Sequence, residues 1–464
     1  MLTRSVTDSL LQYALDRGAD FAELFFEDKD DTTINYDGQV DSVACIRTYG
    51  VGLYLIRDTR SAYVYLNDLT DSGLRGAVDR AAALLGLEGC GTTRLGASHT
   101  LDLTDPCPVA VYPGEVGHAG KIALLTDADR AGRAQSASVH GLKLTWFDRD
   151  QRVTIANTEG LWTEDRRVNC RMRFIPVISN THGTASTFSE YCAAAGIESF
   201  RDGLYLNRLR DQINNLEESI TAVEAPSARV PVVLEAGGCT GTFFHEACGH
   251  QLETTALQRD SIFWDKRGQL IASPKVTVID DGTLPGMYGS ARIDDEGMPR
   301  QKNVLIEQGV LKGYMADRIG AKRLHLERTG SGRRQDYAHA PGARMTNTYL
   351  AAGEDDDEAM LRELDEGLYV TEIGGGTGGR EFTLLAATAY WVKHGEIVAR
   401  VKGATLLGRG DETMLKIDRV GRRFVKEQGG GSFCGADSGF IPTTTSGPRM
   451  RIAEMVVGGK GGKL

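Results

Sequence analysis

The chain has 464 residues, with 53 lysines and arginines against 63 aspartates and glutamates, and therefore a formal net charge of −10. This balance argues against a protein that binds nucleic acid or an anionic membrane, because both need a net basic surface. Hydrophobic residues make up 41% and charged residues 25% of the chain, so a folded protein of about two or three domains is expected and dominant disorder is excluded.

The N-terminal segment predicts neither export nor membrane insertion. Residues 1–20 have an amphipathic helical pattern that charged side chains interrupt, so they lack the apolar centre of a secretory signal. No apolar run approaches the length of about 18 residues that a membrane-spanning helix needs. The eight cysteines show no CxxC spacing, and reduced thiols in a cytoplasmic protein are therefore expected.

The first part of the chain predicts a meander of strands with one covering helix. Alternating apolar and aromatic residues between 21 and 66 predict the strands, with a turn at Tyr49-Gly50. Apolar side chains at helical spacing over 71–85 predict a helix on one face of this sheet. A loop rich in glycine, proline and threonine at 86–114 marks a subdivision.

A second block of the same kind follows. The pattern predicts a helix over 117–135 and strands between 142 and 178, with a turn at Asp148–Asp150. Residues 206–223 keep an i, i+3, i+4 apolar rhythm, which indicates another helix.

An Ala-Pro-Ser linker at 225–227 predicts the main domain boundary. Beyond it, five segments have the composition of strands, at 275–279, 304–308, 368–373, 382–392 and 396–401. The sequence therefore predicts an α+β protein. An N-terminal domain at 1–225 contains an antiparallel sheet with covering helices, and a β-rich C-terminal domain occupies 226–464.

The most informative segment is His245-Glu246-Ala247-Cys248-Gly249-His250. Two imidazoles with a glutamate after the first are typical of the HExxH helix of zinc proteases, but here one extra residue separates them. Five residues turn a regular helix by about 500° and leave the two rings about 140° apart, whereas four residues leave them about 40° apart. Both rings can meet one ion if the helix contains a single π-turn, which Gly249 would ease.

Catalytic zinc usually has three protein ligands and one open position. Cys434, in the glycine-rich segment 429–435, is the candidate third ligand. Cys248 ranks below it, because a small thiol packed under a helix is the commoner role. Glu246 is free to accept a proton from a water that the metal acidifies, which indicates amide hydrolysis. A helix with two structural histidines and a surface glutamate is the alternative on spacing alone.

Further segments resemble one family in collinear order. They are Gly249–Glu253, Arg328–Gln335, Arg344–Tyr349, Gly374–Gly376, Gly403–Leu406 and Cys434-Gly435, together with Gly18–Leu24 and Gly50–Gly52 near the N-terminus. Through these segments the chain resembles the TldD/PmbA family of metalloproteases over nearly its whole length, and specifically the TldD-type subunit that keeps the metal motif.

The resemblance implies a zinc-dependent peptidase with the metal in the C-terminal domain. His245, His250 and Cys434 would hold Zn2+, and Glu246 would be the catalytic base. Substrates would be short or unstructured peptides, including leader segments of modified peptide precursors, which add to a sheet edge. The partner would be an identical chain or a metal-free TldE/PmbA-like homologue, in a dimer that encloses the site. The segment Gly376–Glu381 departs from the family pattern, which bears on substrate preference.

Other residues give weaker signals. Arg333, Arg334 and Arg344 are candidates to orient a peptide carboxylate or an oxyanion, with Tyr337 beside them, although structural ion pairs explain the arginines equally well. The GxGxxG pattern at 374–379 precedes a strand and not a helix, so it does not predict a dinucleotide site. Two other functions stay open, a non-catalytic partner subunit and a metal-binding protein of the same fold.

Overall fold

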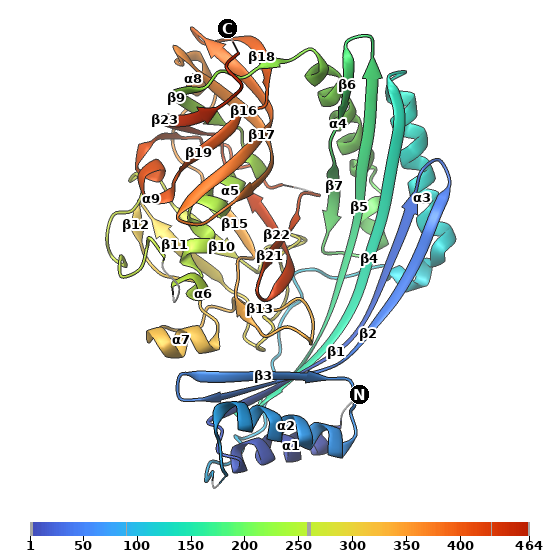
Figure 1. Cartoon of the computed structure of the whole chain (residues 1–464), viewed down its shortest axis with the longest axis vertical. Coiled ribbons are helices and arrows are strands. Elements are labelled where there is room, and N and C mark those ends of the chain that lie inside the picture. Colours follow the sequence, from blue (N-terminus) through green and yellow to red (C-terminus); the bar gives the residue numbers. More distant parts are fainter. Residues whose placement is uncertain (1–2, 90, 258–260, 428, 463–464) are drawn as a thin grey trace.

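The structure is a computed structural model that describes residues 3–89, 91–257, 261–427 and 429–462. In the N-terminal half, one antiparallel sheet has the strand order β3-β2-β1-β4-β5-β6, with β7 also paired to β5 (Figure 1). Its strands are β1 Phe21–Tyr36, β2 Val40–Arg57, β3 Arg60–Leu66, β4 Val139–Asn157, β5 Trp162–Asn180, β6 Gly183–Ser186 and β7 Ser189–Ala193. The helices are α1 Arg4–Asp16, α2 Asp71–Leu85, α3 Pro113–Gln135 and α4 Leu204–Ile220, with a 3₁₀ turn at Ile197–Phe200.

Two pairs of helices cover this long sheet. Helices α1 and α2 form one pair and pack below β3 (Figure 1). Helices α3 and α4 form the second pair, and α3 lies along the outer side of the long strands (Figure 1). The predicted helix 71–85 is confirmed as α2. The Thr70 side chain accepts the Gly73 N–H at its start, and Gly86, at φ +68°, ends it in the left-handed region.

The predicted turn at Asp148–Asp150 is wrong, because this segment continues strand β4. Arg149 pairs with Asp31 on β1 at 2.7 Å, and Asp150 pairs with Arg166 on β5 at 2.6 Å. The charges that predict a turn are therefore neutralised by opposite charges on the neighbouring strands.

The predicted turn at Tyr49-Gly50 is also wrong, because β2 runs through it. The glycines there leave room for a side chain from the other half of the molecule. A Cβ at Gly50 would lie 2.4 Å from Cε2 of Tyr337, and one at Gly52 would lie 1.8 Å from the Tyr63 hydroxyl. That hydroxyl donates a hydrogen bond of 2.7 Å to the Tyr337 carbonyl. Gly50 and Gly52 therefore let the two halves dock.

Replacing Gly52 by alanine is expected to destabilise the protein by about 1–3 kcal/mol, because the added methyl group must displace Tyr63 and its bond to Tyr337. Chemical denaturation measures the change. Gly76→Ala in α2 is the control, since its Cβ would meet only Arg80 Nη1 at 3.5 Å, and it is expected to leave stability unchanged or raise it. Equal stability of Gly52→Ala and the unchanged protein would contradict the docking role.

The C-terminal half contains two larger sheets, with orders β16-β9-β23-β19-β17-β18-β8 and β12-β11-β10-β15-β22-β21. Strand β16 also pairs with β17, which closes five strands of the first sheet into a ring, and β20 pairs with β23. The strands are β8 Val223–Glu224, β9 Ala228–Leu234, β10 Val278–Asp281, β11 Lys302–Glu307, β12 Val310–Leu311, β13 Gly332–Arg333, β14 Gly342–Ala343, β15 Asn347–Leu350, β16 Glu366–Thr377, β17 Glu381–Lys393, β18 Glu396–Lys402, β19 Thr405–Arg409, β20 Ile417–Val420, β21 Ser432–Ala436, β22 Gly439–Ser446 and β23 Met450–Gly458.

Short helices join these strands. They are α5 Gly238–Phe244, α6 Thr254–Leu257, α7 Arg318–Leu324, α8 Ala359–Arg362 and α9 Gly410–Thr413, with a 3₁₀ turn at Met414–Lys416. Helix α5 contacts both β22 and β16, and its Phe243 and Phe244 are fully buried. The predicted α+β fold, with a helix-covered antiparallel sheet followed by a β-rich half, is confirmed.

Two further expectations concern the thiols and the membrane. The seven described cysteines form no disulfide with one another, and Cys90 lies outside the described residues. Within the described part of the chain, no helix combines the length and the hydrophobicity that crossing a bilayer requires.

Candidate metal centre

The two histidines lie on a helical segment that changes type between them. After α5 ends at Phe244, a π-turn covers His245–Gly249, and the His250 N–H bonds to the carbonyl of His245, five residues back. A 3₁₀ turn at His250–Leu252 follows. The predicted irregularity is therefore confirmed, and it brings the two ring centroids to 4.8 Å.

Gly249 is required there by space and not by its backbone angle, which is helical with φ −53°. A Cβ at this position would lie 2.1 Å from the sulfur of Met345, a fully buried side chain. The π-turn can therefore pack against Met345 only because residue 249 has no side chain.

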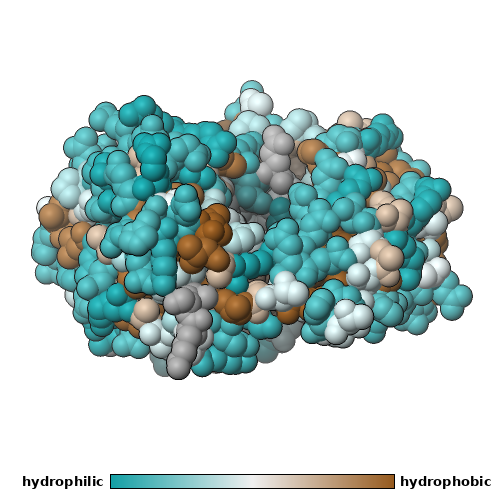
Figure 2. Space-filling model, turned by 90° about the horizontal axis from the view of Figure 1, so that it is seen from above, coloured by the Kyte–Doolittle hydropathy of each residue, from teal (hydrophilic) through white to brown (hydrophobic). Residues whose placement is uncertain are grey.

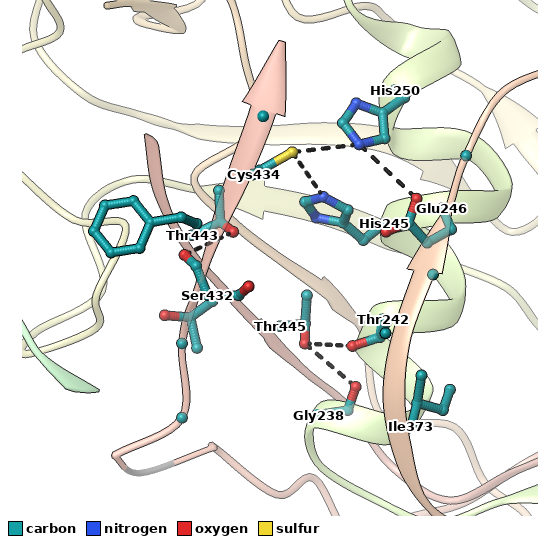
Figure 3. A pocket seen from close by; sticks show the side chains of 18 of the residues that line it. Gly238, Thr242, His245, Glu246, His250, Ile373, Ser432, Cys434, Thr443 and Thr445 are labelled. Atoms are coloured by element: carbon teal, nitrogen blue, oxygen red, sulfur yellow. Dashed lines mark hydrogen bonds and ion pairs between the residues drawn. The ribbon is translucent and has the colours of Figure 1, made fainter. Parts of the chain in front are cut away.

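Cys434 comes from strand β21 and meets both histidines. Its Sγ lies 3.3 Å from Nε2 of His245 and 3.4 Å from Nε2 of His250 (Figure 3). One ligand atom from each of the three residues lies within 4.8 Å of the other two. The structure thus brings together the three side chains that the sequence singled out.

Cys248 lies outside this cluster. It is fully buried, and its thiol donates to the carbonyl of Phe244 at 3.3 Å. Burial raises the pKa of Cys248, which opposes formation of the thiolate that a metal would need.

The donor set fits a tetrahedral cation. Zn–N bonds of about 2.0–2.1 Å and Zn–S bonds of about 2.3 Å place nitrogen and sulfur about 3.5 Å apart, close to the distances found. Burial lowers the pKa of His245 well below its usual value, so this ring is neutral. Burial acts the same way on His250, but Glu253 and Cys434 outweigh it and raise the pKa of His250 well above its usual value. A cation must therefore displace the His250 proton.

Glu246 lies beside the cluster with its Oε2 3.9 Å from Nε2 of His250. Burial raises the pKa of Glu246, while the charge of His250 opposes the shift and Glu253 adds to it. A more basic carboxylate is a better proton acceptor near neutral pH.

Strand β16 passes directly over Glu246. A Cβ at Gly376 would lie 3.0 Å from Cγ of Glu246, and one at Gly378 would lie 2.7 Å from its Oε2. The glycine-rich segment 374–378 therefore allows the backbone to approach the carboxylate closely.

The cluster opens into a cavity of about 1280 Å³. His245, Glu246 and Cys434 line it from the C-terminal half, while Glu190 on β7 and Arg208 on α4 line it from the N-terminal half. Figure 2 shows the two halves as lobes with a hollow between them and mostly hydrophilic side chains around it.

Contacts between the halves reach the segments that carry the cluster. Arg208 pairs with Glu427 at 3.0 Å, and Glu427 accepts the N–H of Gly238 at the start of α5. The Cys192 N–H on β7 donates to the carbonyl of Gly429, just before β21. No local pattern in the sequence indicates these residues, because they belong to elements far apart in the chain.

Of the predicted substrate-binding residues, only Arg344 lines the cavity. Arg333 is buried and donates to the carbonyls of Met345 and Pro442, while Arg334 forms a fully buried pair with Glu23 at 2.6 Å. Tyr337 lies at the junction of the two halves, as described above. Internal contacts account for these three residues, an explanation that the sequence leaves equally open for the arginines.

Glu253 belongs to the site, although the sequence does not predict a role for it. Its Oε2 lies 3.5 Å from Nδ1 of His250, and only 4% of the residue is exposed. The i, i+3 spacing from His250 on a helix was the available signal.

Three family models match the chain. They are described as PmbA/TldA metallopeptidase domain 1 over residues 22–85, the central domain over 112–215 and the C-terminal domain over 227–459. A protein named Metalloprotease TldD homolog from Haemophilus influenzae is 32% identical over 96% of this chain and 94% of its own length. A protein of the same name from Buchnera aphidicola is 31% identical over 88% of this chain and 86% of its own length.

Two solved structures share the fold. A putative modulator of a DNA gyrase from Thermotoga maritima has a TM-score of 0.77 at 19% identity, covering 98% of this chain and 99% of that one. TldE from Thermococcus kodakarensis has a TM-score of 0.72 at 17% identity, covering 97% of this chain and 99% of that one.

Proposed function

Because the chain belongs to the PmbA/TldD family of metallopeptidases, we propose that it is a zinc-dependent peptidase that cleaves short or unstructured peptides. His245, His250 and Cys434 hold the zinc ion, and Glu246 is the catalytic base. The observation that carries this assignment is the convergence of the three donor atoms within 4.8 Å, with the Glu246 carboxylate beside them.

A zinc ion at this site would make water acidic enough to lose a proton near pH 7 and would polarise a peptide carbonyl. Oε2 of Glu246 would accept that proton and return it to the leaving amine. Gly376 and Gly378 let the backbone lie close to this carboxylate, which lines the cavity.

Two strand edges in the cavity support extended peptides as substrates. Beyond Val370, β16 has no strand partner on its β9 side among the described residues, and β21 pairs only with β22. Both edges line the cavity. A peptide that adds to such an edge is held by its backbone, so unfolded chains of many sequences bind, including leader segments of modified precursors.

The proposal also covers the domains, the partner and the location. All three ligands lie within the proposed C-terminal domain, 226–464, and the N-terminal domain, 1–225, supplies the facing wall. A second subunit, either a copy of this chain or a metal-free TldE-like homologue, closes the cavity; the shared fold with TldE supports such a pairing. A reducing cytoplasm would keep the Cys434 thiolate available.

Removing the metal is the direct test. Treating the purified chain with a chelator is expected to abolish cleavage of an unstructured peptide, followed by mass spectrometry, and stoichiometric zinc is expected to restore it. Cleavage that survives complete metal removal would show that the metal role is wrong.

A further inference from the structure

Glu253 contacts one proposed ligand, His250, and reaches a second, Cys434, through Arg344. One carboxylate oxygen, Oε2, lies 3.5 Å from Nδ1 of His250, the ring nitrogen that faces away from the cluster. The other oxygen, Oε1, accepts the N–H of Met345 at 3.2 Å and lies 3.7 Å from Nε of Arg344. The carboxylate is therefore held from both sides.

Arg344 carries the connection to the third ligand. Its Nη2 donates to the carbonyl of Cys434 at 2.7 Å, and its Nη1 donates to Oγ of Ser438 at 3.0 Å and to the carbonyl of Gly439 at 3.2 Å. These three acceptors surround the turn between β21 and β22, so one guanidinium fixes the hairpin that presents the Cys434 sulfur. Arg344 is only 2% exposed.

We propose that Glu253 and Arg344 form a positioning pair that sets the metal affinity of the site. Glu253 orients the His250 ring so that Nε2 faces the ion, and Arg344 holds the backbone of Cys434 in register with it. The inference rests on the proposed zinc site, and neither residue touches the ion. It explains how His250 and Cys434, 184 residues apart in the chain, are held at one point by the contacts of Glu253 and Arg344.

The chemistry favours this arrangement over a purely structural ion pair. A histidine that binds a metal through one nitrogen is held best when the other nitrogen donates to a carboxylate, which fixes the tautomer and raises the basicity of the ligand. Among the described residues, Glu253 is the carboxylate that an ion pair places at His250 Nδ1. His245 has no such support, because its buried Nδ1 has no hydrogen-bond partner in the described part of the chain.

The experiment measures zinc affinity by competition with a chromophoric chelator, using the full chain freed of metal. Glu253→Gln is expected to weaken zinc binding about 10–100-fold, the usual range for a residue that supports a metal ligand. Arg344→Lys is expected to act in the same direction. The double variant is expected to lose less than the product of the two single losses, because the residues act as one unit.

The matched control is Glu23→Gln, which removes a carboxylate from the buried pair with Arg334, outside the cavity. It is expected to lower thermal stability but to keep the zinc affinity within about twofold, while zinc raises the melting temperature of Glu253→Gln less than that of the unchanged protein.

Unchanged zinc affinity in both Glu253→Gln and Arg344→Lys would overturn the inference but would not contradict the proposed zinc site. If the unchanged protein binds no zinc, both the proposed zinc site and the inference are wrong. Should Glu253→Gln not fold, Arg344→Lys alone decides the outcome.

Discussion

Replacing Glu246 by glutamine is expected to lower the rate of peptide hydrolysis by about 10²–10⁴-fold while zinc binding stays intact. The amide has almost the same shape as the carboxylate, so the contacts with β16 persist, but it cannot accept a proton. The measurements are peptide cleavage followed by mass spectrometry and zinc content of the purified variant.

Glu372→Gln is the matched control for this variant. Glu372 is an exposed carboxylate on β16 that lines the same cavity and accepts a hydrogen bond from Thr388 at 3.1 Å. Its rate is expected to change only a few-fold. A Glu246→Gln enzyme as active as the unchanged protein would assign the base elsewhere. If the unchanged protein cleaves nothing but binds zinc, a non-catalytic subunit or a metal-binding protein becomes the better explanation.

Replacing Cys434 by serine is expected to weaken zinc binding by more than the roughly 100-fold that loss of a supporting residue causes, and to abolish hydrolysis. A serine hydroxyl stays protonated near neutral pH and replaces a thiolate poorly as a zinc ligand. Competition with a chromophoric chelator measures the affinity.

Cys248→Ala is the control, because Cys248 belongs to the π-turn, is fully buried and donates to the carbonyl of Phe244. It is expected to keep the zinc affinity and to lose some stability. If Cys248→Ala and not Cys434→Ser releases the metal, the two cysteines have been assigned in the wrong order.

The sequence predicts those features that residues within one short segment determine. The apolar spacing over 71–85 predicts helix α2, and the Thr70 cap and Gly86 that bound the helix in the structure lie beside the same segment. The need for a π-turn followed from the spacing of His245 and His250 alone, because the geometry of a helix is fixed.

Features that depend on packing between distant parts of the chain could not be predicted from the sequence. The glycine at 50 predicted a turn, but it is there because Tyr337, far away in the chain, occupies the space. The sequence makes Arg334 a candidate for substrate binding, but the fold buries it in an ion pair with Glu23. The contribution of Arg208 to the cavity wall depends on how the two halves dock, which no single segment encodes.

The contact between position 249 and Met345 narrows the amino-acid pattern by which related sites can be recognised. With a Cβ only 2.1 Å from the buried sulfur, residue 249 tolerates no side chain while Met345 stays in place. The informative signature is then His-Glu-x-x-Gly-His and not a pattern with three free positions. A genome search that demands the glycine would discard most chance matches, and a sequence that lacks it should show a smaller residue where Met345 stands.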